Sequence, residues 1–289
     1  MAAVTSISQL RDWTGAIWHD ESNRSHRVYA LARAAGWQVW KRTVRRPLTT
    51  KLFNGLRFQV YPDCTTSSST FYSRIPYSRN LHFLRGQISG GTLIDIGANV
   101  GLISVLLADK IQHALLFEPN PTAVARAREN IALNQLPFQV HEVALSDQNG
   151  TVSFEDLGGA SPCNRVVSGI TTNAPTITVP CMRLDDFLEQ HANFPAPIAA
   201  IKIDVEGHEN SVLQGMTRTL RERRPRVIMF EYLQRTDLRK TFEIFGKCGY
   251  KVTFLTSSGE LQQAGLDVQP LQDLFACPEE LAAELARAS

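Results

Sequence analysis

From Gly91 onward, short apolar strands alternate with amphipathic helices, and this alternation limits the fold more narrowly than any other feature. Strands are predicted at 92–96, 114–118 and 138–143, with helices after the glycine turn at 97–101 and from Pro121. In the second helix Val124, Ala127 and Ile131 fall on one face. A strand–helix–strand–helix–strand order requires a parallel sheet with right-handed crossovers and helices on its faces.

The alternation resumes after an interruption. Further strands are predicted at 198–205, 226–231 and 250–255, and further helices at 209–216 and 237–248. The stretch Asp147–Pro197 is rich in turn residues, and we interpret it as an insertion between the third and fourth strands. The sequence therefore predicts an α/β fold with a doubly wound, Rossmann-like sheet.

The first part of the chain has a different composition. Residues 1–90 contain 13 Lys+Arg and 4 Asp+Glu, whereas residues 91–289 contain 17 and 24, so the net charge of +2 conceals a balance of +9 against −7. All four tryptophans lie in the first 40 residues. We expect a basic, aromatic helical extension at 1–50, ended by Pro47. The polar run that begins at Thr65 predicts a surface loop or lid leading to Arg79.

Composition excludes several classes of protein. No apolar run reaches the ~18 residues that span a bilayer, and the first residues lack the apolar core of a signal peptide. A cytoplasmic protein is expected on these grounds. The five cysteines are far apart and form no CxxC pair, so a zinc ribbon is excluded.

The first candidate site follows the first strand. Asp95, Gly97, Asn99 and Gly101 form a glycine turn between a strand and a helix, which presents backbone N–H groups to an anionic ligand group. Glu118 follows 23 positions after Asp95, at the end of the second strand. A carboxylate there can accept hydrogen bonds from both hydroxyls of a ribose.

Two ligands suit this arrangement, a nicotinamide dinucleotide and S-adenosylmethionine. The dinucleotide fingerprint needs a middle glycine where a pyrophosphate approaches, and that position is Asn99. Asp95 would repel phosphates, but it can pair with the cationic amino group of S-adenosylmethionine. Charge complementarity therefore favours the methyl donor.

The second candidate site ends the fourth predicted strand, next to the first at the topological switch point. The segment from Ile201 to Glu209 places the carboxylates of Asp204, Glu206 and Glu209 around His208. Their spacing matches no strong metal signature, so no metal is predicted.

Five segments of this chain together resemble the FkbM family of S-adenosylmethionine-dependent methyltransferases. They are DIGANVG at 95–101, FEPNP at 117–121, ALSDQNG at 144–150, IKIDVEGHE at 201–209 and VIMFE at 227–231. The resemblance runs from about Leu56 to Tyr250, and IKIDVEGHE is its most specific part. It implies a seven-stranded, mostly parallel sheet, a class I methyltransferase domain at 51–289 with the insertion at 147–197, and O-methylation of a sugar or natural product.

The resemblance also suggests roles for individual residues. Adenine is expected near Ala144, at the end of the third strand. A base that removes the proton of the acceptor hydroxyl assists methyl transfer. Asp204 is the first candidate for that base and His208 the second; Glu206, Glu209 and Glu231 are expected to act beside them or to bind acceptor hydroxyls.

Other functions stay open. A Rossmann oxidoreductase using NAD(P) shares the glycine turn, although no hydride-transfer signature is present. A non-catalytic methyltransferase-like binding module is the third reading. No nucleic-acid partner is expected, because no base-methylation motif follows the fourth strand. The basic front either caps the sheet domain or makes peripheral contact with an anionic membrane surface.

Overall fold

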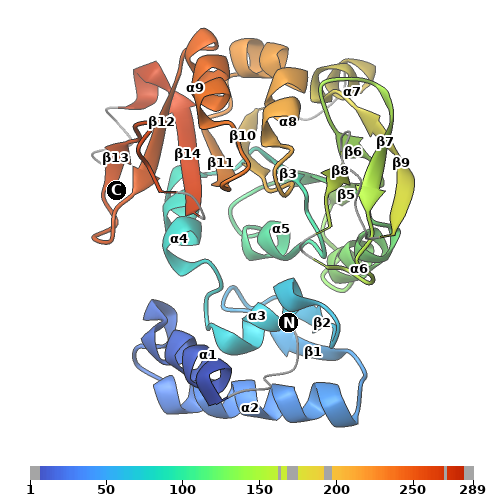
Figure 1. Ribbon diagram of the computed structural model, residues 1–289, viewed down its shortest axis with the longest axis vertical. Coiled ribbons are helices and arrows are strands. Elements are labelled where there is room, and N and C mark those ends of the chain that lie inside the picture. The colour runs from blue at the N-terminus through green and yellow to red at the C-terminus, as the bar shows by residue number, and fades with distance from the viewer. Residues whose placement is uncertain (1–6, 162–163, 168–174, 192–196, 270–271, 283–289) are drawn as a thin grey trace.

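The computed structural model describes residues 7–161, 164–167, 175–191, 197–269 and 272–282. Its centre is an eight-stranded sheet in the order β13-β12-β14-β11-β10-β3-β4-β5 (Figure 1). The strands are β3 (Thr92–Ile96), β4 (His113–Phe117), β5 (Phe138–His141), β10 (Ile198–Ile203), β11 (Val227–Tyr232), β12 (Tyr250–Leu255), β13 (Leu261–Gln263) and β14 (Gln272–Pro278). The fold is the predicted doubly wound α/β sheet, and the short β13 at one edge adds an eighth strand to the seven expected.

Two strands run against the others: the short edge strand β13, which is antiparallel to β12, and β14. β14 is antiparallel to both β11 and β12, between which it lies, whereas β3, β4, β5, β10 and β11 are parallel. The sheet is thus mostly parallel, as the family resemblance implied. The apolar side chains of β14, from Leu274 to Cys277, are buried on both faces of the sheet. A helix follows β14; it begins at Glu279 and is described as far as Ala282.

Helices cover both faces of the central sheet. Neighbouring residues of β3 serve opposite faces: Leu93 packs with α4, α5 and α6, and Ile94 with α7, α8 and α9. Parallel strands buried on both sides have this continuous apolar character. The helices are α4 (Ser78–Gln87), α5 (Leu102–Leu106), α6 (Pro121–Ala132), α7 (Leu184–Gln190), α8 (Glu209–Gly215) and α9 (Leu238–Lys247).

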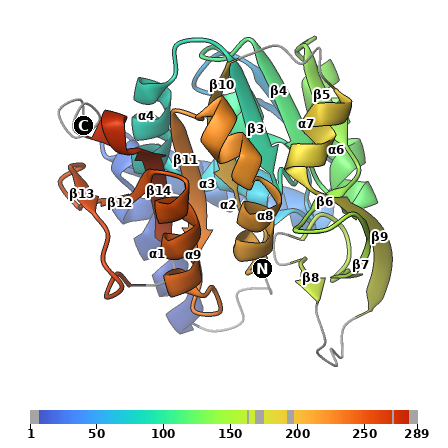
Figure 2. The same cartoon turned by 90° about the horizontal axis from the view of Figure 1, so that it is seen from above.

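The stretch expected as an insertion forms, together with the short strand just before it, a second sheet beside the central one (Figure 2). Its four strands have the order β6-β9-β7-β8. They are β6 (Ala144–Leu145), β7 (Gly150–Glu155), β8 (Val166–Val167) and β9 (Thr176–Met182). The insertion therefore has ordered β-structure of its own, and part of the predicted range lies outside the described residues.

The N-terminal part contains α1 (Ile7–His19), α2 (Arg27–Thr43) and a hairpin of β1 (Leu48–Lys51) with β2 (Arg57–Val60). The boundary expected near residue 50 passes through this hairpin. Trp37 is buried, its ring stacks on Phe71 with centroids 4.8 Å apart, and its Nε1 donates to Ser68 Oγ at 3.0 Å. Trp37 therefore fastens α2 to the segment that follows the hairpin.

That segment corrects the expectation of a surface loop. Thr65–Tyr72 is the helix α3, and Ser67, Ser68 and Thr70 are buried in it. Their hydroxyls donate to carbonyls one turn earlier, so the polar side chains are satisfied without water. The loop prediction was wrong because a run of Ser and Thr indicates a loop only when no neighbouring element buries it. Thr66 and Tyr77 of the segment line the cavity described below, so a role of this segment beside the site stays a prediction.

Among the described residues, no helix is long and apolar enough to cross a membrane.

Candidate active site at the carboxyl ends of the central strands

A cavity of about 220 Å³ opens at the carboxyl ends of β3, β4, β10 and β11. This is the edge at which doubly wound folds bind ligands. Most of the residues predicted for the site line it: Gly97, Asn99, Glu118, Ala144, Asp204, Glu206, His208 and Glu231. Asp95, Gly101 and Glu209 do not.

The glycine turn brings the two predicted motifs together. Gly97 has φ +71°, and a Cβ on it would meet the carbonyl oxygen of Asp204 at 1.8 Å. Only glycine permits β3 and β10 to end this close together. Asn99 also has a left-handed backbone, with φ +50°, and Gly101 with φ +77° precedes α5. The N–H groups of this turn are already bonded within the protein: Gly97 and Ala98 donate to the carbonyl of Phe117 at 2.9 and 3.1 Å, and Gly101 donates to that of Ala98 at 2.8 Å. The expectation that these groups face an anionic part of a ligand is therefore wrong.

Glu118 forms a buried acceptor at one end of the cavity. Its two carboxylate oxygens accept the backbone N–H groups of Asn99 and Asn120, each at 2.9 Å. Burial raises the pKa of Glu118 to about 7, although these hydrogen bonds oppose the shift. Each oxygen keeps a further lone pair, so hydroxyl donors from a ligand would be bound here.

Behind the turn, Asp95 is fully buried and faces a cation of the protein itself. Its Oδ2 accepts from Ser104 Oγ at 2.7 Å, and its Oδ1 lies 3.6 Å from Lys202 Nζ. Lys202 Nζ donates to the carbonyl of Gly97 at 2.7 Å and lies 3.3 Å from Asp204 Oδ2. Burial alone would lower the pKa of Lys202, but the charges of Asp204 and Asp95 outweigh it and raise that pKa.

Sequence reasoning missed Lys202. Its signal was present, because a lysine between two isoleucines in a buried parallel strand is unusual unless it is paired. Asp95 was expected to face the amino group of a ligand. In the structure its charge is already matched by Lys202, and it does not line the cavity.

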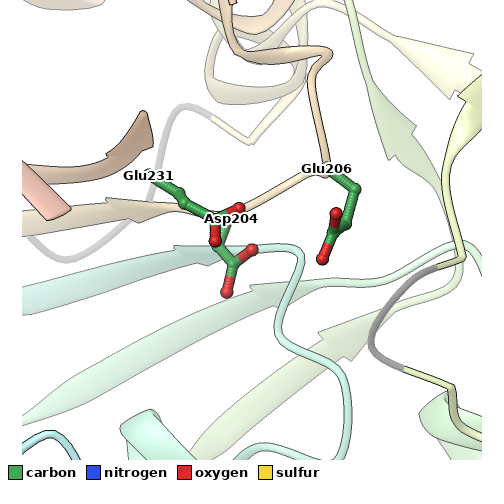
Figure 3. A group of neighbouring side chains, drawn as sticks. All are labelled: Asp204, Glu206 and Glu231. Atoms are coloured by element: carbon green, nitrogen blue, oxygen red, sulfur yellow. The ribbon is translucent and has the colours of Figure 1, made fainter. Parts of the chain in front are cut away.

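Three carboxylates gather at the other end of the cavity. Asp204, Glu206 and Glu231 each place one oxygen within 4.8 Å of the others (Figure 3). Burial and the charges of Asp204 and Glu206 raise the pKa of Glu231 to about 8, and its Oε2 has no hydrogen-bond partner in the described structure. Glu206, with φ +55°, is held by an ion pair with Arg235.

A fourth carboxylate adjoins this cluster, from a strand that the sequence did not predict. Asp273 on β14 is the cross-strand partner of Glu231 and lines the cavity. Asn80 Nδ2 donates to it at 2.6 Å, and burial raises its pKa to about 6.

Oxygen ligands this close together suit a divalent cation. However, Lys202 and Arg235 already pair with two of the three carboxylates. We therefore keep the metal-free site as our expectation.

The hydrogen bonds of His208 and Glu209 go to residues outside the acidic cluster. His208 Nε2 is 2.9 Å from Ser146 Oγ, next to β6, and burial lowers the pKa of the imidazole. Glu209 is fully buried and accepts from the N–H of Gly207 at 2.9 Å and from Thr236 Oγ1 at 3.1 Å. Glu209 thus holds the turn after β10. We no longer expect it to bind hydroxyls of the molecule that receives the methyl group.

Comparison with known proteins agrees with this geometry. The family model described as "Methyltransferase FkbM domain" matches residues 95–252. The hexuronic acid methyltransferase AglP of Haloferax volcanii is 33% identical over 130 residues, which are 44% of this chain and 51% of AglP. The 2-O-methyltransferase NoeI of Sinorhizobium fredii is 34% identical over 151 residues, 46% of this chain and 60% of NoeI. The chain thus spans about half the length of these relatives.

A solved FkbM methyltransferase from Methylobacillus flagellatus aligns over 73% of this chain and 52% of its own, with 14% identity and a TM-score of 0.43. The family model is the stronger finding, because it covers more than half of the chain and includes both the glycine turn and the segment from Ile201 to Glu209. The chain belongs to the FkbM methyltransferase family.

Proposed function

We propose that this protein transfers a methyl group from S-adenosylmethionine to a hydroxyl of a sugar or natural-product acceptor. The family and the names of two relatives, a hexuronic acid methyltransferase and a 2-O-methyltransferase, support this activity. The observation that carries it is that one cavity contains both Glu118, which can accept hydrogen bonds from ribose hydroxyls, and a cluster of carboxylates that can bind the hydroxyls of an alcohol.

The residues at the Glu118 end suit the donor. Glu118 would accept the ribose hydroxyls, and the backbone of Gly97 and Asn99 would face the amino-acid end. Ala144 and Phe117 provide an apolar wall for adenine. Asp95 would act indirectly, because it holds Lys202 against the carbonyl of Gly97 and so fixes the turn.

The residues at the acidic end suit the acceptor. The donor, when bound, supplies a methyl group on a positively charged sulfur. Asp204 is 43% exposed in its side chain, so its carboxylate is accessible to an acceptor hydroxyl and would take its proton as the oxygen attacks. Glu206, fixed by Arg235, and Glu231 would bind neighbouring hydroxyls. His208, bonded to Ser146, would position the β6 wall or serve as a second base.

The charge at the acidic end of the cavity limits which acceptor molecules can bind there. Asp204, Glu206 and Asp273 line this end beside Glu231, which keeps its proton at neutral pH, and the nearby cations Lys202 and Arg235 are already paired. A carboxylate on the acceptor would be repelled if it lay beside the reacting hydroxyl. We therefore favour a neutral, hydroxyl-rich acceptor, or one whose acidic group points away from the cluster.

Calorimetric titration with S-adenosylmethionine tests the donor site. We expect micromolar affinity, with a loss of at least tenfold in Glu118→Ala and none in Glu243→Ala, which removes an exposed glutamate from α9. Asp204→Asn should keep donor binding and lose transfer of labelled methyl to sugar and polyketide acceptors. Absence of donor binding to folded protein would overturn the proposal.

A further inference from the structure

The side of α2 that faces away from the protein is apolar. Val28 is 74% exposed, Tyr29 66% and Val39 62%. Ala32 and Ala35 are exposed between them, at the helical spacing that places residues on one side. We call Val28, Tyr29, Ala32, Ala35 and Val39 the α2 outer face.

The opposite side of α2 already provides the packing that the fold needs. Ala30, Ala34 and Trp37 are buried there. Figure 1 shows α2 along the outer edge of the molecule, with α3 on its inner side. A helix that is apolar on both sides normally has neighbours on both sides. The described structure offers the α2 outer face no neighbour.

The sequence around this helix carries charge of one sign only. Residues 24–62 contain nine Lys+Arg and no Asp or Glu. Among the described residues none of these nine forms an ion pair, whereas nearby arginines do, as in Arg79–Glu21 and Arg85–Asp109. Four of the nine follow one another closely at the end of α2: Lys41, Arg42, Arg45 and Arg46.

We propose that the α2 outer face lies on a lipid bilayer whose surface carries anionic headgroups. Val28, Tyr29 and Val39 would enter the boundary between headgroups and acyl chains. The exposed cations Arg42, Arg45 and Arg46 would contact lipid phosphates, whereas Lys41 lies on the inner side of α2 beside Ser68 and Tyr72. Apolar side chains on one side of a helix, flanked by Lys and Arg, bind membranes in this way.

Two other partners for the α2 outer face, a second copy of the chain and nucleic acid, explain the observations less well. A second copy of the chain would bring the same unpaired cations against themselves across a two-fold axis. Nucleic acid would satisfy the cations, but it would leave the exposed valines and the tyrosine without a role. An anionic bilayer accounts for both features at once.

Vesicle sedimentation with the full chain tests this proposal. We expect binding to phosphatidylcholine vesicles containing 30% phosphatidylglycerol at least tenfold tighter than to phosphatidylcholine alone. The double substitution Val28→Glu/Val39→Glu should weaken binding at least tenfold. Leu266→Glu, the same change at an exposed apolar residue after β13, should leave it unchanged.

Removing positive charges from the end of α2 tests whether electrostatic attraction to the headgroups contributes to binding. Each cation near an anionic surface contributes roughly a fivefold gain in affinity. The triple substitution Arg42→Gln/Arg45→Gln/Arg46→Gln should therefore weaken binding strongly, and Arg221→Gln/Arg223→Gln, two exposed arginines of the sheet domain, should not. Circular dichroism of each variant checks that the fold is kept.

Three results would overturn the proposal. The first is equal or absent binding to both kinds of vesicle. The second is a dimer in light scattering that Val28→Glu/Val39→Glu dissociates without a change in vesicle binding, which would assign the face to a second copy. The third is DNA binding stronger than vesicle binding and unaffected by the Val→Glu changes.

Discussion

At the scale of single residues, Lys202 makes the most demanding contribution, because it is a cation enclosed with two carboxylates. Substitution by methionine leaves Asp95 buried and unpaired, so we expect Lys202→Met to lower the free energy of unfolding by about 3–5 kcal/mol. Urea denaturation measures this loss. Adding Asp95→Asn removes the unpaired charge and should recover a large part of it. Additive losses in the double variant would show that the 3.6 Å pair carries no coupling.

Glu231 gives a prediction about pH. Burial and neighbouring carboxylates raise its pKa to about 8, so at pH 7 the group keeps its proton and can donate to an acceptor oxygen. We expect the KM for the acceptor to rise above pH 8, where the proton is lost. Glu231→Gln keeps a donor and should give a flat profile, whereas Glu231→Ala should raise KM about tenfold throughout. Loss of kcat in Glu231→Gln would instead make Glu231 the base.

At the scale of elements, the junction of β3 and β10 depends on Gly97. Alanine there meets the Asp204 carbonyl at 1.8 Å, in addition to adopting a left-handed backbone. Gly259 has a similar φ of +88° with open space around it, so Gly259→Ala isolates the backbone effect. We expect Gly259→Ala to lower the free energy of unfolding by about 1 kcal/mol and Gly97→Ala by about 1–3 kcal/mol more. Equal losses in urea denaturation would contradict this view of the junction.

Elements whose cause is local were predictable from the sequence. β3 was predicted at its observed bounds, because a short apolar run before a glycine turn specifies a buried parallel strand. α3 was not, because its serines are acceptable in a helix only once Trp37 and β2 bury them. Asp273 was not predicted as a site residue for a similar reason: it adjoins the site only through the pairing of β14 with β11, which is a long-range contact.

At the scale of the whole molecule, too, features with a local cause were predictable from the sequence, whereas features that depend on long-range contacts were not. The doubly wound sheet and the adjacency of the fourth predicted strand to the first, now β10 beside β3, followed from the alternation. The sequence also indicated that Asp204, Glu206 and Glu231 belong to one site. The position of the N-terminal helices was not predictable, since nothing local in α2 says which side meets α3. The contact of Asp95 with Lys202 also arises from register between β3 and β10.

The buried carboxyls together predict how stability depends on pH. The folded protein raises the pKa of Glu118 to about 7 and of Glu231 to about 8, above the values near 4.3 of an unfolded chain. Between those values only the folded state keeps the protons, so raising the pH lowers the free energy of unfolding. His141 and His208 have the opposite effect, because burial lowers their pKa, but that contribution ends near pH 6.5.

The window from pH 6.5 to 8.0 therefore isolates the carboxyls. Glu231 is partly open to solvent, so we discount its contribution to about 1 kcal/mol, which corresponds to a fall in Tm of about 2–4 °C. Calorimetry of the ligand-free protein measures it. Glu231→Gln should reduce the fall, because an amide does not titrate, and the part that remains belongs to Glu118; Glu243→Gln at an exposed position should leave the fall unchanged. A Tm that rises across this window would mean that the folded protein binds no extra protons, and the acidic end of the cavity would then be ionised at neutral pH.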